Sequence, residues 1–208
     1  MQKMVYDLFK SSLITMWPSL VIVTVTLITI RFAYLKNQRG PFSFYREFWT
    51  LISVVYMLLL YQMVTRVDIN ASSGINLVPF TEILRYDVHS ELFFYNVVGN
   101  IALFMPFGFI VSAYVKPRKI WTNLFVALIV SGTIEIVQLN IGRSFDIDDI
   151  ILNTLGCIIG FLGYVGFKAI IKHLPNFLKS DWFNNLICII ITICIFLYVL
   201  NIMGIAFR

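Results

Sequence analysis

Long stretches of apolar residues without charge divide this chain more sharply than any other feature of its sequence. One helix needs about 20 such residues to cross a bilayer, and backbone groups inside lipid must be paired within the protein, which favours helices. Six runs of this kind, one of them interrupted by Glu135, lie at residues 11–30, 48–65, 92–115, 120–142, 150–167 and 182–207. The sequence therefore predicts an all-α, polytopic bundle of about six transmembrane helices that forms a single membrane domain over residues 1–208.

The composition agrees with a membrane protein and argues against several other classes. Hydrophobic residues make up 59% of the chain and charged residues 13%, which is more apolar than a soluble domain requires. The sequence pI of about 9.2 does not indicate nucleic-acid binding, because the basic residues lie in short loops between apolar runs. Cys157, Cys188 and Cys194 lie inside apolar runs and form no CxxC pair. They are expected to be packed core residues rather than disulfides or zinc ligands.

The distribution of Lys and Arg over the loops predicts an orientation in the membrane. Ten of these residues fall in the loops that follow the first, third and fifth runs, and six fall elsewhere, on the side that also carries most of the carboxylates. Loops rich in Lys and Arg remain in the cytoplasm. The three basic loops are therefore expected to be cytoplasmic, and both termini extracytoplasmic.

The longest polar connection, residues 66–91, contains apolar residues at helical spacing after Pro79. Proline is favoured at the first position of a helix, and short amphipathic helices lie at membrane surfaces. We therefore expect a short interfacial helix near residues 79–88, with Pro79 at its first position. A plain extracellular loop is the simpler alternative.

The stretch from Gly142 to Gly163 begins with a polar cluster and continues as an apolar run. At about 100° per residue, Asp148 points away from one helical face, which carries Asp146, Asp149, Asn153, Gly156 and Gly160. Polar groups in a membrane helix are costly unless they face protein or water, and glycines let another helix approach closely. This face is therefore predicted to point inward, with Gly156 and Gly160 at a helix contact.

Further polar residues lie in the halves of the neighbouring runs that are predicted to be outermost. These residues are Asn96, Asn100, Glu135, Gln138, Arg143 and Asn153. Residues one turn apart share a helical face, so they could build one outward-facing polar pocket together with the aspartates. Pro106 and Gly108 are expected to kink the run at 92–115, because proline removes a backbone hydrogen bond.

The charged members of this set each have a functional and a structural interpretation. A guanidinium such as that of Arg143 suits bidentate recognition of phosphate, but it could also balance Asp146 and Asp149. Glu135 is a functional candidate because ionisable groups are rare within membrane spans, or it is a structural partner of Arg143. Together with Glu135, the two aspartates could hold a divalent cation through oxygen ligands; alternatively, they cap a helix N-terminus.

The three amides also allow two interpretations. Asn100, Gln138 and Asn153 could contact the polar atoms of a ligand, or they could form hydrogen bonds between helices. No Ser-His-Asp set, HExxH motif, phosphate loop or dinucleotide fingerprint occurs in the sequence.

Four motifs combine these residues at fixed spacings. They read NLVPF at 76–80, N-x-x-G-N-x-x-x-F-x-P-x-G at 96–108, E-x-x-Q at 135–138 and R-x-x-D-x-x-D-x-x-x-N-x-x-G-x-x-x-G at 143–160. The set resembles the VanZ-like family over about residues 45–170, whereas the flanking helices at 11–35 and 182–207 lie outside the resemblance. It implies an integral protein of the bacterial cell membrane, in a family whose namesake raises resistance to teicoplanin-type lipoglycopeptides. The resemblance leaves the biochemical mechanism open.

Two functions are compatible with this sequence. In the first, the pocket binds an anionic lipid or a lipid-linked cell-wall precursor, with Arg143 on its phosphate. In the second, the chain is an intramembrane enzyme that cuts or transfers a phosphate-containing lipid, with Glu135 as general base or with a divalent metal that activates water. The lack of a paired nucleophile and base favours binding, and a transporter is disfavoured because the chain lacks two matching halves. The oligomeric state is left open.

Overall fold

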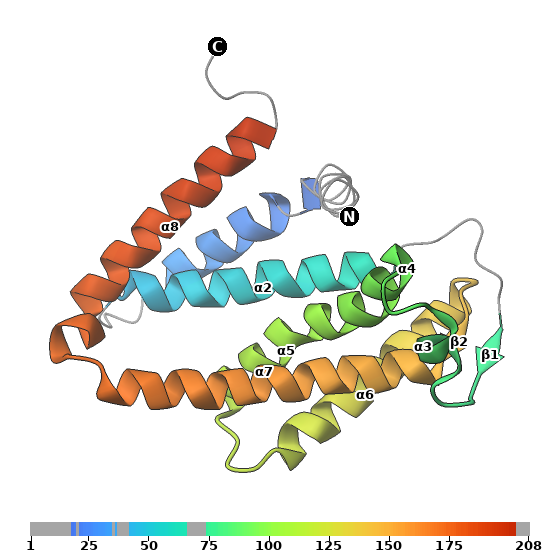
Figure 1. The fold of residues 1–208 in the computed structure, drawn as a ribbon. Helices are drawn as coiled ribbons and strands as arrows, with labels where there is room; N and C mark the ends of the chain where they lie inside the picture. The colour runs from blue at the N-terminus through green and yellow to red at the C-terminus, as the bar shows by residue number, and fades with distance from the viewer. Residues whose placement is uncertain (1–17, 20, 35, 37–41, 66–73, 203–208) are drawn as a thin grey trace. The chain divides into compact units, whose positions relative to one another are not determined.

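The computed structural model describes residues 18–19, 21–34, 36, 42–65 and 74–202 (Figure 1). Its helices long and apolar enough to cross a membrane are α2 (Phe44–Val64), the segment Glu91–Val115, α6 (Trp121–Asn140), α7 (Ile147–His173) and the Asp181–Tyr198 part of α8 (Asp181–Ile202). A shorter apolar helix covers Val21–Tyr34. The predicted all-α class is confirmed, and much of the first predicted span lies outside the described residues.

The remaining elements are short. They are β1 (Ile75–Asn76), α3 (Thr81–Arg85), α4 (Glu91–Phe93), η1 (Phe94–Val98), α5 (Gly99–Val115), β2 (Phe145–Asp146) and η2 (Asn176–Lys179). The helix α3 lies within the interfacial segment expected near residues 79–88. However, it begins at Thr81, so Pro79 does not occupy the first helical position. Proline is also well suited to a tight turn, and Pro79 lies in the turn that leads into α3.

Two compact units make up the chain, one comprising Met1–Leu59 with Ile171–Arg208 and the other Leu60–Ile170. In the first unit, the guanidinium of Arg31 donates to both carboxylate oxygens of Glu47, at 2.7 and 3.0 Å. The side-chain oxygen of Asn185 accepts a hydrogen bond from the backbone N–H of Tyr45 at 2.8 Å, which joins the starts of α8 and α2. All polar motifs from Asn76 to Gly160 lie in the second unit.

In the second unit, α5 and α7 pack at glycines. A Cβ atom added to Gly156 would overlap the carbonyl of Ile101, and one added to Gly160 would overlap that of Met105. Gly108 makes the reciprocal contact, because a Cβ there would overlap the backbone of Cys157. Backbones this close require residues without side chains.

The inner face of α6 is mostly polar along its whole length. Its buried residues are Asn123, Ala127, Ser131, Glu135 and Gln138. At the start of α6, the amide of Asn123 donates to the carbonyl of Gly108 at 3.0 Å and to the hydroxyl of Ser112 at 2.7 Å. Hydrogen bonds between buried side chains thus join α6 to α5 in a region where water is scarce.

The third apolar run is irregular upstream of its proline. It contains a π-helical segment, Phe94–Val98, and α5 continues through Pro106 to Val115. A π-helical turn bonds residues i and i+5 and therefore shifts the helical register. Accordingly, Asn96 donates to Leu92 of its own helix, whereas Asn100 reaches α7. Asn96 and Asn100 thus have different hydrogen-bond partners, one within its own helix and one on α7.

Candidate functional site

Polar side chains of the second unit gather where α6 ends and α7 begins. In Figure 1, β1, β2 and α3 lie at this end of α7. Glu135 is 1% exposed, and its Oε2 accepts the backbone N–H of Asp146 at 2.8 Å. The chain turns between them at Gly142, whose φ of 87° is a conformation that glycine adopts without strain.

Asp146 connects this turn to the loop before α3. Ile75 and Asn76 pair with Phe145 and Asp146 in a parallel two-stranded ladder. The Oδ1 atom of Asp146 accepts from the amide of Asn76 at 3.1 Å and from the backbone N–H of Asp148 at 2.9 Å. Burial raises the pKa of the Asp146 carboxyl above its usual value. The two hydrogen bonds offset part of the cost of burying the ionised group.

Asp148 has a structural role that its position off the motif face did not indicate. Its carboxylate is 1% exposed and accepts the backbone N–H groups of Phe80, Glu82 and Ile83, at 2.5, 2.8 and 3.2 Å. Phe80 lies in the left-handed region at φ 66°, which is unusual for a bulky residue. Asp148 therefore caps α3 from a distant part of the chain and stabilises this strained turn.

Asp149 and Asn153 face the neighbouring helices. Oδ1 of Asp149 accepts a hydrogen bond from the amide of Asn100 at 2.6 Å, which links α7 to α5. The amide of Asn153 lies 2.9 Å from the hydroxyl of Ser131, which links α7 to α6. The structure thus brings together the three helices that the sequence predicted to share a polar region.

Arg143 and Gln138 meet at a single acceptor, the carbonyl oxygen of Val64 at the end of α2. Gln138 donates to it from Nε2 at 2.9 Å, and Arg143 donates from Nη1 at 3.2 Å. Arg143 is half-buried. Within the described part of the chain, no ion pair involves this guanidinium. Sequence reasoning could not foresee the contact because the acceptor is a backbone atom of an apolar helix.

Two amide oxygens in this region lack a hydrogen-bond partner among the described residues. They are Oε1 of Gln138 and Oδ1 of Asn153, on side chains that are 5% and 4% exposed. Buried polar atoms are usually paired, so an unpaired one calls for an explanation.

The carboxylates are placed for hydrogen bonding rather than for joint coordination of a metal. Among the described residues, no group of three Asp, Glu, His or Cys side chains is arranged to hold a metal ion. Glu135 and Asp146 each accept a backbone N–H, and Asp149 accepts an amide. The divalent cation predicted for these three residues thus gains no support from their geometry.

An apolar groove of about 370 Å³ runs along α7 beside Leu128 of α6. It is lined from α7 by residues at helical spacing, which are Ile147, Ile150, Ile151, Thr154, Leu155 and Ile158. At 100° per residue these positions lie opposite the face that carries Asp149 and Gly156. The groove is therefore separate from the polar side chains of the site, which we call the polar cluster: Asn100, Glu135, Gln138, Arg143, Asp146, Asp149 and Asn153.

Comparison with known proteins assigns the family. The VanZ/LLP1 family model matches residues 48–171, which include all polar residues of the candidate site. The chain belongs to the VanZ/LLP1 family. Protein VanZ of Enterococcus faecium is 30% identical over 163 residues, which cover 77% of this chain and 91% of that protein. No solved structure matches the chain. The predicted family membership is thus confirmed, and this VanZ/LLP1 protein has several helices suited to a multi-pass membrane protein.

Proposed function

We propose that this VanZ/LLP1 protein resides in the bacterial cell membrane and contributes to resistance to teicoplanin-type lipoglycopeptides. In this proposal, the polar cluster binds the head group of an anionic lipid or a lipid-linked cell-wall precursor. The family membership supports the resistance role. The geometry of Arg143 supports the binding role.

Arg143 is the observation on which the binding proposal rests. Its guanidinium is half-buried at a helix end and is held in place by the carbonyl of Val64. A guanidinium carries five N–H donors and pairs bidentately with phosphate oxygens. The bond to Val64 orients the group and leaves most of its donors for a ligand.

The buried carboxylates fit a supporting role around this arginine. Glu135 accepts the Asp146 N–H and so fixes the turn that carries Arg143. Asp149 accepts a hydrogen bond from the amide of Asn100, at the start of α5. Among the described residues, Glu135 bonds the Asp146 N–H, and no Ser, Thr or Cys side chain is hydrogen-bonded to it as a paired nucleophile would be. The contacts therefore favour binding over the enzymatic alternative.

Three conservative substitutions test this assignment in cells. Arg143→Lys keeps the charge but loses the bidentate fork, so teicoplanin resistance should fall to the level of cells that lack the protein. Glu135→Gln and Asp149→Asn each retain an acceptor oxygen for their partner, so resistance should fall less, by about two- to fivefold if each loses roughly 0.5–1 kcal/mol of hydrogen-bond strength. The minimum inhibitory concentration of teicoplanin is measured beside the abundance of each variant in membranes.

The outcomes separate the interpretations. Resistance that declines in step with abundance would show that the three residues act through folding alone. Complete loss in Glu135→Gln at normal abundance would favour the enzyme. Normal resistance in Arg143→Lys at wild-type abundance would contradict the proposal.

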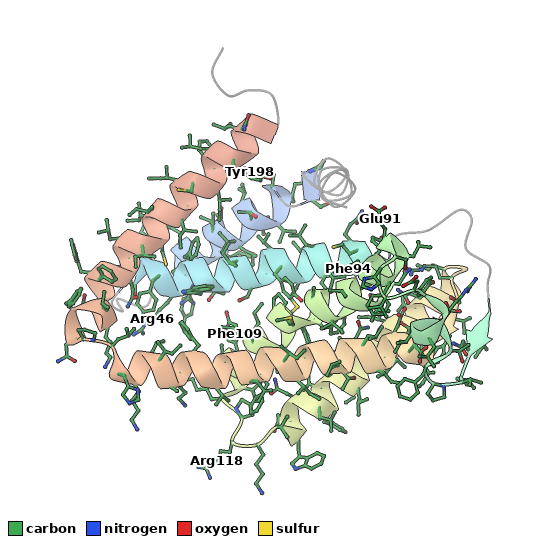
Figure 2. All side chains as sticks on the ribbon, in the orientation of Figure 1. Arg46, Glu91, Phe94, Phe109, Arg118 and Tyr198 are labelled. Atoms are coloured by element: carbon green, nitrogen blue, oxygen red, sulfur yellow. The ribbon has the colours of Figure 1, made fainter. Side chains whose placement is uncertain are left out.

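The proposed orientation places the polar cluster on the extracytoplasmic side. Lys116, Arg118 and Lys119 follow α5, and Figure 2 shows Arg118 at the opposite end of the second unit from Glu91 and Phe94. Basic loops favour the cytoplasm, so the end with Glu91 would face outward. Both termini would then be extracytoplasmic as well.

Single cysteines at two exposed loop positions should report this orientation. In intact cells, an impermeant thiol reagent should label His89→Cys and leave Lys119→Cys unlabelled until the membrane is opened. The native cysteines provide a low background because Cys157 and Cys188 are buried and Cys194 lies in an apolar helix. The reverse labelling pattern would place the cluster in the cytoplasm.

A further inference from the structure

The directions of the hydrogen bonds in the polar cluster indicate which chemical groups a bound head group must carry. The positive charge of Arg143 alone indicates only that the head group is anionic. The amide of Gln138 donates to the Val64 carbonyl, and the amide of Asn100 donates to the Asp149 carboxylate. The Val64 carbonyl can only accept, so the Gln138 amide cannot be flipped. Its amide nitrogen is therefore directed at a protein atom.

Apart from the donors of Arg143, the atom left for a ligand beside the Val64 carbonyl is the amide oxygen of Gln138. Oε1 of Gln138 is unpaired among the described residues, and the side chain is 5% exposed. Asn153 bonds the Ser131 hydroxyl, which can donate or accept, so its amide leaves either its oxygen or an N–H for a ligand. An unpaired buried acceptor is unfavourable, and a fully ionised phosphate cannot relieve it because its oxygens only accept. The relief has to come from a group that carries N–H or O–H.

The position of Gln138 relative to Arg143 places this donor beside the phosphate. Both side chains contact the same Val64 oxygen, at 2.9 and 3.2 Å, so the amide and the guanidinium are neighbours. A phosphate bound to Arg143 would therefore carry its next substituent close to Gln138. This step rests on the binding role proposed above.

We propose that the site selects a phospholipid head group that bears a hydrogen-bond donor next to its phosphate, namely a hydroxyl or an ammonium group, over a bare phosphate. Gln138 is the selecting residue and Asn153 assists it. Arg143 supplies the attraction that all phosphate-containing head groups share.

A lipid titration of the purified protein in detergent tests this selection, at about pH 8, where a phosphate monoester with a second pKa of about 6 carries no O–H. Phosphatidylglycerol presents hydroxyls, phosphatidylethanolamine presents an ammonium, and phosphatidic acid presents a phosphate alone. Wild-type protein should bind at least one of the first two about tenfold more tightly than phosphatidic acid, the scale expected from pairing one buried acceptor. Which of the two binds more tightly distinguishes a hydroxyl from an ammonium donor.

Gln138→Leu should reduce this preference to about onefold, because it weakens the binding of the donor-bearing head groups more than that of phosphatidic acid. The Val64 carbonyl keeps its bond from Arg143 in this variant, and the ratio of two affinities within one variant does not depend on its stability. Asn153→Leu should lower the ratio less. Asn140→Leu is the matched control, because Asn140 is exposed and its amide bonds Ile136 of its own helix.

One set of results would overturn the selection of a donor-bearing head group, and another would overturn the phosphate-binding site at Arg143. Equal affinity of the wild-type protein for all three lipids, or an equal loss for all three in Gln138→Leu, would overturn the selection alone. Binding that is unaffected by Arg143→Ala would instead overturn the binding site, and with it the selection. Absence of binding for every lipid would have the same consequence.

Discussion

Replacement of Gly160 by leucine is expected to destabilise the second unit strongly. A side chain at this position would overlap the carbonyl of Met105 and the backbone nitrogen of Phe109. Backbone atoms of a helix cannot relieve an overlap by changing rotamer, as side chains can, so α5 and α7 would have to separate. Overpacking typically costs about 1–3 kcal/mol, and we expect the upper end of that range. Thermal unfolding in detergent measures the loss.

Two other glycines of α7 make this result interpretable. Gly156→Leu should behave like Gly160→Leu, because a Cβ there would overlap the carbonyl of Ile101. Gly166→Leu should have little effect, since nothing lies within 4 Å of a Cβ at that position. Equal losses at all three positions would mean that leucine destabilises α7 for a reason unrelated to its contact with α5.

Removal of the Asp148 carboxylate should release the loop that carries α3. Asp148→Ala leaves the N–H groups of Phe80, Glu82 and Ile83 without their acceptor. Hydrogen bonds to a charged group contribute roughly 1.5–3 kcal/mol each. The combined loss should exceed about 3 kcal/mol, which corresponds to amide exchange on the order of 100-fold faster at residues 80–83. Hydrogen exchange followed by mass spectrometry measures this directly.

Glu82→Gln is the matched control for this prediction. The Glu82 side chain accepts hydrogen bonds from Arg85 and Tyr86. Only the backbone N–H of Glu82 bonds Asp148. Exchange at residues 80–83 should therefore remain slow. Slow exchange in Asp148→Ala as well would show that the loop is held by something other than this carboxylate.

The helical elements and the inward face of α7 could be predicted from the sequence because their signals are local. An uncharged run of sufficient length predicts a span, and residues at helical spacing define a face. Gly156 and Gly160 lie at the α5–α7 contact for this reason. Asn100, Glu135 and Asn153 could likewise be predicted as polar residues within apolar runs, where burial demands partners, and Asp149 as part of the polar stretch directly before the run at 150–167.

The features that could not be predicted depend on contacts between distant parts of the chain. Asp148 caps a helix 65 or more residues earlier in the sequence, and its place off the α7 face suggested no partner. The β1–β2 ladder has two residues in each strand, too few for an alternating pattern. The π-helical turn at Phe94–Val98 has no clear signature in an apolar run. Asn123 could have been recognised, because an amide within such a run requires a partner.

The central claim is that Arg143 holds the phosphate of a lipid head group, and native mass spectrometry of protein purified from bacterial membranes tests it most directly. Wild-type protein should retain one bound anionic phospholipid per chain, and Arg143→Ala should lose it. Arg85→Ala should retain the lipid, because Arg85 is exposed and pairs with Glu82. Equal lipid retention in wild-type protein and Arg143→Ala, or an absence of bound lipid in both, would contradict the account.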